Sequence, residues 1–182
     1  MLKNKYETFI SKASQNDSVA IWNWRNNEHT RLMSQTTGEV SWDSHNSWFT
    51  NSLQNVNCYL YIGKLANKSK VATCRFDIDA INKTAEVSIN LNPVFRGKKI
   101  SVKFLKKAIK LFCKSNKVDL KATIKKINAA SIKCFIRCNF IFVSEDETYN
   151  YYRLQMIQGD EIQNKLKLID KIEKIRTANN MI

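Results

Sequence analysis

The 182-residue chain has little glycine, proline or histidine, with four, one and two residues of each. This scarcity excludes collagen-like and Gly/Pro-rich disordered chains, and no linker or repeat divides the sequence. No run approaches the roughly 20 apolar residues of a membrane-spanning helix. The first residues also lack the apolar core of a secretory signal. We therefore expect a single domain that stays in the cytoplasm.

Metal-ligating residues are also few. The five cysteines contain no Cys-x-x-Cys pair, and two histidines cannot complete a closed zinc site around Cys134 and Cys138, which lie one helical turn apart. We expect no metal, and free thiols in a reducing compartment.

Acidic residues are outnumbered, with 16 Asp and Glu against 30 Lys and Arg, giving a net charge of +14. Nucleic acid, a membrane surface and an anionic small molecule are all compatible with this excess. Most lysines alternate with apolar residues at helical spacing, as on a solvated helix face. Charge alone therefore does not identify the partner.

Hydrophobic periodicity predicts a mixed α/β sheet in one domain. Two helices come first, and the earlier one is interrupted near Asn26 and Asn27. Strands and helices then follow, with the strand at 84–93 alternating cleanly between apolar and polar residues. The expected helices span residues 17–34, 41–53, 100–112, 128–138 and 160–176, and the expected strands 58–65, 70–79, 84–93, 118–126, 140–145 and 149–155.

The stretch LNPVFRGKKIS, residues 91–101, carries the strongest functional signal. It runs from a strand through a tight turn into a helix, where free N–H groups at the positive helix end favour anions. Gly97 allows close backbone approach or a positive φ. Lys98, Lys99 and Lys103 crowd the first turn, where cations are disfavoured by about 0.3–1 kcal/mol each. A bound pyrophosphate would reverse that penalty; an exposed turn in a lysine-rich chain is the other interpretation.

A strand followed by Pro-x-x-Arg-Gly-Lys-x-Ile and an amphipathic helix resembles the acetyl-CoA signature of the GNAT acyltransferases. The resemblance implies a largely antiparallel central sheet flanked by helices. Lys99 and Ser101 stand where the family usually has glycine, and right-handed helical dihedrals would tolerate both. The cofactor-binding residues that the resemblance implies in this segment are Leu91, Asn92, Val94, Arg96, Gly97, Lys98, Lys99, Ile100 and Ser101.

Downstream, Asn128, Ser131 and Phe135 resemble the family segment that holds the pantetheine arm. Asn128 also reads as a helix N-cap, and both roles are compatible. In the family a tyrosine at the position of Phe135 protonates the departing thiolate, and a glycine occupies the position of Asn139. The usual general acid is therefore missing from this chain.

The segments WRNNEHTRLM, SWDSHNSWF and RFDID resemble those of the GNAT enzymes that acetylate nucleotide-linked amino sugars in pseudaminic and legionaminic acid synthesis. The resemblance spans about residues 15–155. It implies that Arg25, His45, Arg75 and Asp77 frame the acceptor, with both arginines suited to a diphosphate. A buried histidine and a salt-bridged arginine are the simpler interpretations.

Direct attack of the amine on the thioester requires a base, an oxyanion donor and an acid. We predict Glu86 as the base, although it could equally pair with a lysine. The oxyanion donor would be an amide of residues 90–92, exposed by a strand bulge. Tyr149, Tyr151 or the neighbouring Tyr152 could supply the acid, as an alternative to packing; otherwise the thiolate leaves unassisted.

The predicted activity is therefore transfer of acetyl from acetyl-CoA to a primary amine, most simply on an amino sugar. Acetylation of a protein N-terminus or lysine is one alternative. A degenerate protein that binds CoA or nucleic acid without catalysis is another. We assign residues 1–158 to the acyltransferase domain and residues 159–182 to a helical extension, whose apolar face packs across the domain or forms a homodimer.

Overall fold

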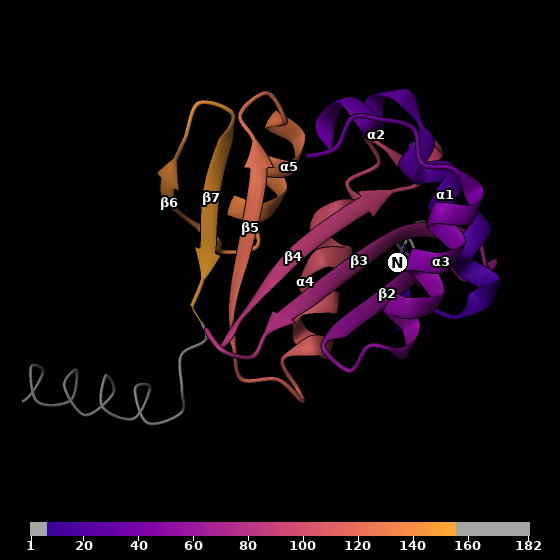
Figure 1. Cartoon of the computed structure of the whole chain (residues 1–182), viewed down its shortest axis with the longest axis horizontal. Coiled ribbons are helices and arrows are strands. Elements are labelled where there is room, and N and C mark those ends of the chain that lie inside the picture. Colours follow the sequence, from indigo (N-terminus) through magenta and orange to yellow (C-terminus); the bar gives the residue numbers. More distant parts are fainter. Residues whose placement is uncertain (1–6, 156–182) are drawn as a thin grey trace, which may run out of the picture.

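The computed structural model describes residues 7–155, which form one seven-stranded sheet between two layers of helices (Figure 1). The strand order is β1-β2-β3-β4-β5-β7-β6, and every neighbouring pair is antiparallel except β4 and β5. The strands are β1 (Phe9–Lys12), β2 (Cys58–Lys64), β3 (Lys70–Asp79), β4 (Thr84–Leu91), β5 (Asp119–Lys125), β6 (Ile141–Glu145) and β7 (Tyr149–Leu154). The expected mixed sheet is confirmed.

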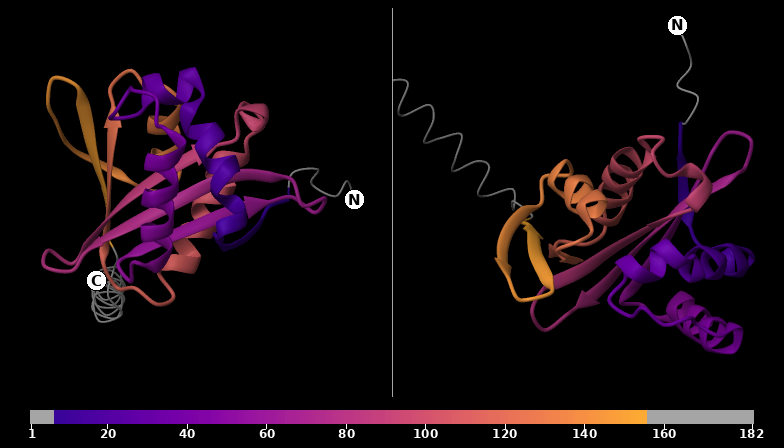
Figure 2. Two further views of the ribbon diagram at one scale, coloured as in Figure 1. Left: turned by 45° about the vertical axis from the view of Figure 1, so that its right-hand side comes forward. Right: turned by 90° about the horizontal axis from the view of Figure 1, so that it is seen from above.

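The helices divide between the two faces of the sheet. Seen from above, α4 and α5 cover one face, while α1, α2 and α3 lie on the other (Figure 2). Their bounds are α1 (Ser18–Asn26), α2 (Glu28–Met33), α3 (Trp42–Gln54), α4 (Ile100–Phe112) and α5 (Ala129–Ile136). All five were expected from the sequence, including the interruption between α1 and α2.

Short polar side chains fix where three helices begin. Asn27 Oδ1 accepts a hydrogen bond from Thr30 N, Ser41 Oγ from Ser44 N, and Asn128 Oδ1 from Ser131 N. Each bond satisfies a first-turn amide that has no partner within its helix.

Each face of the sheet carries its own hydrophobic core. Under α4, Phe112 stacks on Phe76 of β3 with ring centroids 4.2 Å apart, and Phe104 is fully buried. A smaller core joins α1 and α3 to β2 through buried residues that include Ile21, Phe49 and Ile62. Both faces of the central strands are therefore covered, and the functional site must open between elements.

The opening is set by how β4 and β5 pair. Their parallel register covers only Thr84↔Asp119, Ala85↔Leu120 and Glu86↔Lys121. Beyond Glu86 the two strands spread apart, as Figure 1 shows. The main-chain groups of β4 that face β5 beyond this point lack a strand partner.

One strand of the structure was not expected, and two expectations lie outside the described residues. Strand β1, a four-residue edge strand with three exposed residues, was not predicted, because a strand this short has no measurable alternation. The expected tail helix and the boundary at residue 158 lie outside the described residues. Within residues 7–155 no helix is long and apolar enough to cross a membrane.

Candidate active site

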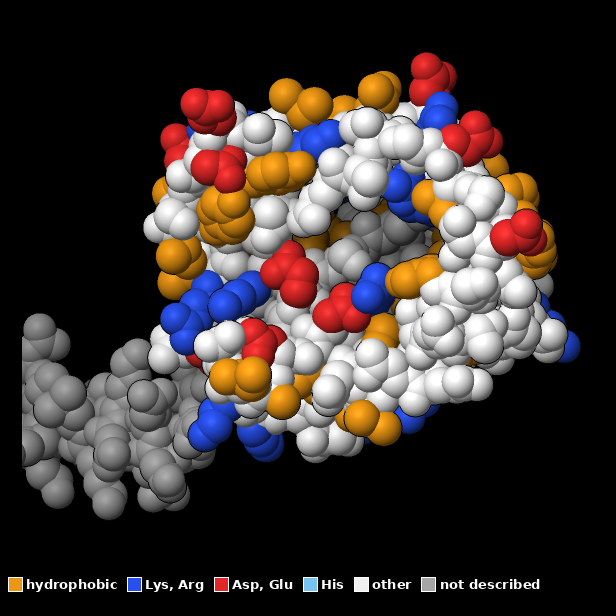
Figure 3. Space-filling model, viewed as in Figure 1, with side chains coloured by type: hydrophobic (Ala, Val, Ile, Leu, Met, Phe, Trp, Pro, Cys, Tyr) orange, Lys and Arg blue, Asp and Glu red, His pale blue; other side chains and the backbone are white. Residues whose placement is uncertain are grey.

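A cavity of about 570 Å³ lies where β4 and β5 separate. Figure 3 shows the face that carries it, with a hollow near the centre and charged side chains around it. The wall opposite the sheet comes from α1, α2 and the loop before α3, including Arg25, Thr30, Met33 and residues 34–36. The floor comes from β3 and β4, including Thr73, Arg75, Asp77, Glu86, Ser88 and Asn90.

The cavity also passes through the sheet. It is lined by five consecutive residues of β4, from Glu86 to Asn90, whose side chains alternate between the two faces. It reaches Thr123 on β5 and Asn128, Ser131 and Phe135 around the start of α5. The gap between the strands therefore connects the α1–α3 side to the α5 side.

Glu86 lies at the point where the two strands part. Its Oε1 accepts a hydrogen bond from the backbone N–H of Thr123 at 2.8 Å. This contact holds a carboxylate in the cavity lining and satisfies an amide that the separated strands leave unpaired. Its partner is thus a main-chain amide of β5, not the lysine considered from the sequence.

Arg75 and Asp77 form an ion pair on the cavity floor. Arg75 Nη2 lies 2.7 Å from Asp77 Oδ1, and its Nε donates to the same oxygen at 2.8 Å. The Arg75 guanidinium also lies over the Trp48 ring, 5.1 Å from its centroid. Asp77 lies opposite Glu86 in the β3–β4 register, so two carboxylates neighbour each other on this floor.

Arg25 contributes positive charge to the opposite wall. Its Nη2 donates to the carbonyl of Thr36 at 2.7 Å, while its Nη1 is buried and has no hydrogen-bond partner in the described part of the chain. Burial lowers the pKa of Arg25, and the nearby Arg31 guanidinium lowers it further. Arg25 is therefore an incompletely compensated cation that lines the cavity.

The loop that carries Thr36 is held by the same part of α1. Asn26 Nδ2 donates to the Val40 carbonyl at 2.8 Å, and its Oδ1 accepts from Val40 N at 2.9 Å. Trp22 Nε1 donates to the same carbonyl at 2.8 Å. Trp22, Arg25 and Asn26 thus shape the cavity wall as one unit.

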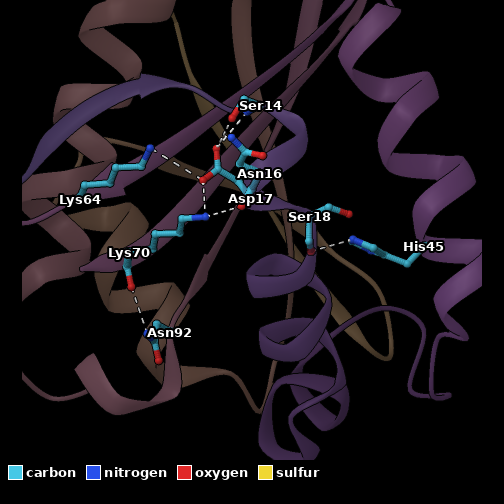
Figure 4. A network of polar contacts seen from close by, with 8 residues as sticks. All are labelled: Ser14, Asn16, Asp17, Ser18, His45, Lys64, Lys70 and Asn92. Carbon is cyan, nitrogen blue, oxygen red and sulfur yellow. Dashed lines mark hydrogen bonds and ion pairs between the residues drawn. The ribbon is translucent and has the colours of Figure 1, made fainter. Parts of the chain in front are cut away.

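His45 lines the cavity, but its ring is buried among aromatic side chains and its Nε2 lies 3.0 Å from the Ser18 carbonyl (Figure 4). Burial lowers the pKa of His45, and the hydrogen bond to Ser18 offsets part of this effect. The neutral ring therefore ties α3 to the start of α1, which is the simpler role considered from the sequence.

The same network continues through Asp17, which is 1% exposed. Asp17 Oδ1 lies 2.8 Å from Lys70 Nζ, and Oδ2 accepts from Ser14 N at 2.9 Å (Figure 4). Asn92 Nδ2 donates to the Lys70 carbonyl at 3.0 Å. The start of α1 is thus linked through β3 to the turn that follows β4.

In that turn, Gly97 and Lys99 both have a positive φ. Gly97 has φ +74°, as its flexibility allowed, and an added Cβ would meet no atom within 4 Å. Lys99 has φ 57° and ψ 27°, which is the left-handed conformation, not the expected right-handed one. The glycine usual here in the resembling family would carry no strain, whereas lysine does. Ser101 lies inside α4 with right-handed backbone, as expected.

The side chains of the predicted cofactor segment are largely engaged in structure. Asn92 Oδ1 accepts from Val94 N at 3.1 Å, Ile100 is buried in the core, and Lys98 Nζ lies 5.0 Å from the Phe95 ring centroid. Arg96 donates to α2 and does not line the cavity. Leu91 packs against the main core, and Val94 is 70% exposed. This segment can therefore contribute main-chain amides at the start of α4, from Ile100 onward.

The second predicted cofactor segment does line the cavity, through Asn128, Ser131 and Phe135. Asn128 caps α5, so the N-cap expectation is confirmed. Phe135 is buried and packs edge-on against Phe140, with centroids 4.9 Å apart. Asn139, at the position of the family glycine, has φ 69°, a conformation that asparagine tolerates better than most residues.

The expected bulge in β4 is wrong. The β3–β4 register runs without a shift from Asp79↔Thr84 to Ala72↔Leu91, and Asn92 N donates to the Val71 carbonyl at 2.9 Å. The alternation of an antiparallel ladder then directs the amides of Ile89 and Leu91 toward the gap. Unpaired amides are thus available there without a bulge.

The structure does not bring the predicted tyrosines to the cavity. Tyr149 and Tyr151 lie on β7, one strand beyond β5, and neither lines it. The Tyr151 hydroxyl donates to Asp146 Oδ2 at 2.5 Å, and Tyr152 is buried in the core. Among the predicted site residues, Glu86 gathers instead with Arg25, Arg75, Asp77 and Asn128.

Sequence reasoning missed several cavity residues, among them Thr30, Thr73, Ser88 and Thr123, and considered Asn90 only for its main-chain amide. Ser88 and Asn90 share the polar face of β4 with Glu86, so the alternation of that strand already contained the signal. Thr30 and Thr123 carried none, because only the tertiary packing places them beside β4.

Comparison with solved structures identifies the fold. Spermidine N-acetyltransferase from Vibrio cholerae, in complex with CoA and spermine, has a TM-score of 0.74 at 14% identity over 82% of this chain and 95% of its own. The yncA protein of Salmonella typhimurium, with acetyl-CoA, has 0.71 at 20% identity over 84% and 96%. An N-acetyltransferase from Staphylococcus aureus Mu50 has 0.68 at 22% over 84% and 100%. No family model and no curated protein matches the chain.

The chain therefore has the fold of the GNAT N-acetyltransferases. At these identities the likeness establishes the architecture, and the activity must be argued from the site.

Proposed function

We propose that this protein transfers an acetyl group from acetyl-CoA to a primary amine by direct attack on the thioester. The observation that carries the proposal is the cavity through the β4–β5 gap, lined by Glu86 where the strands part and by the start of α5. An extended amide-containing arm can pair with the unpaired main-chain groups of β4, as a neighbouring strand would. The residues present therefore fit an acyl-CoA.

Each chemical task has a candidate group. Glu86 would accept the proton that the attacking amine loses, directly or through water. An amide of Ile89 or Leu91 would donate to the oxyanion, since both face the gap. As nitrogen bonds to the carbonyl carbon, the carbon–sulfur bond breaks and the thiolate takes a proton. Phe135 cannot supply that proton, so solvent protonation fits this site best.

The acetyl-CoA assignment is tested by thermal shift and thiol release. Acetyl-CoA at 100 times its Kd should stabilise the fold by about 2.7 kcal/mol. Free thiol should then appear only when an amine acceptor is added. Absence of any stabilisation at millimolar acetyl-CoA would reject the proposal, and salt-sensitive oligonucleotide binding in its place would favour the non-catalytic alternative.

For the acceptor, we propose an amino sugar, most simply one linked to a nucleotide. Arg25 supports an anionic acceptor, because this cation lines the cavity and its buried Nη1 has no hydrogen-bond partner in the described part of the chain. Arg75 supports it less, because its guanidinium is already paired with Asp77. A UDP-linked 4-amino sugar, spermidine and a lysine peptide form the test panel. Preference for spermidine or the peptide would contradict this acceptor without affecting the acetyl-CoA assignment.

A further inference from the structure

The short helix α2 forms one wall of the cavity without burying any of its residues. Thr30 and Met33 of α2 line the cavity, as do the residues that follow, 34–36. Burial of apolar side chains is the usual source of stability for a helix this short. Polar contacts must therefore hold this wall in place.

Two basic side chains from other elements provide such contacts. Arg96 Nη1 donates to Asn27 Oδ1 at 2.9 Å, and its Nη2 donates to Thr30 Oγ1 at 2.5 Å. Lys125 Nζ donates to the carbonyl of Leu32 at 3.0 Å. The first contact fixes the start of α2 and the second fixes its end.

These contacts matter because of the elements from which the two side chains come. Arg96 comes from the turn between β4 and α4, and Lys125 is the last residue of β5, three residues before Asn128. Both belong to elements that border the proposed acetyl-CoA site. Asn27 Oδ1 accepts from Arg96 and also from Thr30 N, so the cap of α2 depends on the same contact.

We propose that Arg96 and Lys125 are positioning residues that hold α2 in place as the acceptor wall. The side chain of Arg96 thus positions the wall that binds the acceptor, while the turn around it binds acetyl-CoA through main-chain amides. The planar fork of a guanidinium suits this role, because it engages two acceptors on α2 at once. The inference rests on the proposed function for its kinetic consequence, though not for the contact itself.

The test compares Arg96→Lys, Thr30→Val and the double variant, with Thr37→Val as the matched control. Thr37 lies in the exposed loop after α2 and does not line the cavity. Amide hydrogen exchange across residues 28–34 measures the wall directly and needs no substrate. We expect faster exchange there in both single variants and unchanged exchange in the control.

The kinetic arm uses acetyl-CoA and a UDP-linked 4-amino sugar. Each single variant should raise the acceptor KM about tenfold, the range for a lost hydrogen bond to a charged group, with acetyl-CoA Kd within about twofold of wild type. The double variant should resemble Arg96→Lys alone, because that substitution already removes the contact to Thr30.

Three results would overturn the inference. One is unchanged exchange in α2. Another is additive effects of the two substitutions, which would make Thr30 a direct acceptor contact. The third is a weaker acetyl-CoA Kd in Arg96→Lys with an unchanged acceptor KM, which would make Arg96 a phosphate ligand. A wild-type protein that releases no thiol would refute the proposed function instead, and the exchange experiment would still decide on the contact.

Discussion

Glu86 Oε1 and the backbone N–H of Thr123 are joined by a 2.8 Å hydrogen bond across the mouth of the gap between β4 and β5. The Glu86 carboxylate therefore has two roles to separate: it satisfies the Thr123 amide, and it lines the cavity as the proposed general base. These two contributions separate experimentally, because a glutamine side chain keeps the acceptor oxygen and loses the charge.

We expect Glu86→Gln to lower kcat by about 10²–10⁴-fold, the range for loss of a general base, with acetyl-CoA Kd unchanged. Steady-state kinetics and calorimetry provide the measurements. Glu86→Ala should in addition lower the melting temperature, because Thr123 N–H loses its partner. A Gln variant with near-normal kcat would show that Glu86 is structural only.

Arg25→Ala should raise the KM of a UDP-linked 4-amino sugar at least tenfold and leave the KM of spermidine unchanged. The reason is the cation that Arg25 contributes to the cavity wall, whose buried Nη1 has no hydrogen-bond partner within residues 7–155. Arg137→Ala is the matched control, since Arg137 is exposed, follows α5 and does not line the cavity. Equal losses with both acceptors would indicate a general packing defect.

Lys99→Gly should stabilise the fold by about 0.5–1 kcal/mol. Glycine adopts the left-handed conformation of this residue without the steric cost of about 1–2 kcal/mol, although it adds entropy to the unfolded chain. Lys103→Gly, in the right-handed first turn of α4, should instead destabilise by a similar amount. Urea denaturation of both variants provides the comparison, and equal signs for the two would contradict the reasoning.

Gly63→Ala should destabilise the fold by about 1–3 kcal/mol through overpacking. A Cβ at Gly63 would lie 2.7 Å from Cε2 of Phe104, a side chain that is fully buried. Gly38→Ala is the control, because nothing lies within 4 Å of the corresponding position. Thermal unfolding that ranks Gly38→Ala as equally harmful would rule out this explanation.

Stability at low pH should depend on Asp17. Burial alone raises the pKa of its carboxyl, but Lys70, the Ser14 amide and Lys64 together bring the pKa below its ordinary value of 3.8. A depressed folded-state pKa adds stability that is fully present above about pH 5 and is lost as pH falls through that pKa. The difference in unfolding free energy between wild type and Asp17→Asn should therefore be constant near neutrality and shrink in acid. A difference that does not begin to shrink as pH falls below the ordinary pKa of 3.8 would contradict this assignment.

Much of the fold could be predicted from the sequence because its elements are strongly periodic. The alternation of β4 placed Glu86, Ser88 and Asn90 on one face, and caps such as Asn128 marked where helices begin. Partners far apart in sequence could not be predicted. Arg96 and Thr30 are 66 residues apart, and nothing in either local pattern indicates their contact.

For the turn between β4 and α4, the sequence predicted the position and not the backbone conformation. The motif located it correctly, yet the side-chain pattern gave no sign that Lys99 takes a left-handed conformation. A lysine in that region costs energy locally, so only the packing of the turn between β4 and α4 can impose it.

Because the cavity crosses the sheet, the two substrates of the proposed transfer can enter from opposite sides without passing each other. Neither has to leave before the other arrives, so both occupy the protein together at the moment of transfer. Initial-rate plots at several fixed concentrations of one substrate should then intersect, as expected for a ternary complex, and should not run parallel. An abortive complex of acceptor with desacetylated CoA is equally accessible, so free CoA should inhibit turnover at high concentration.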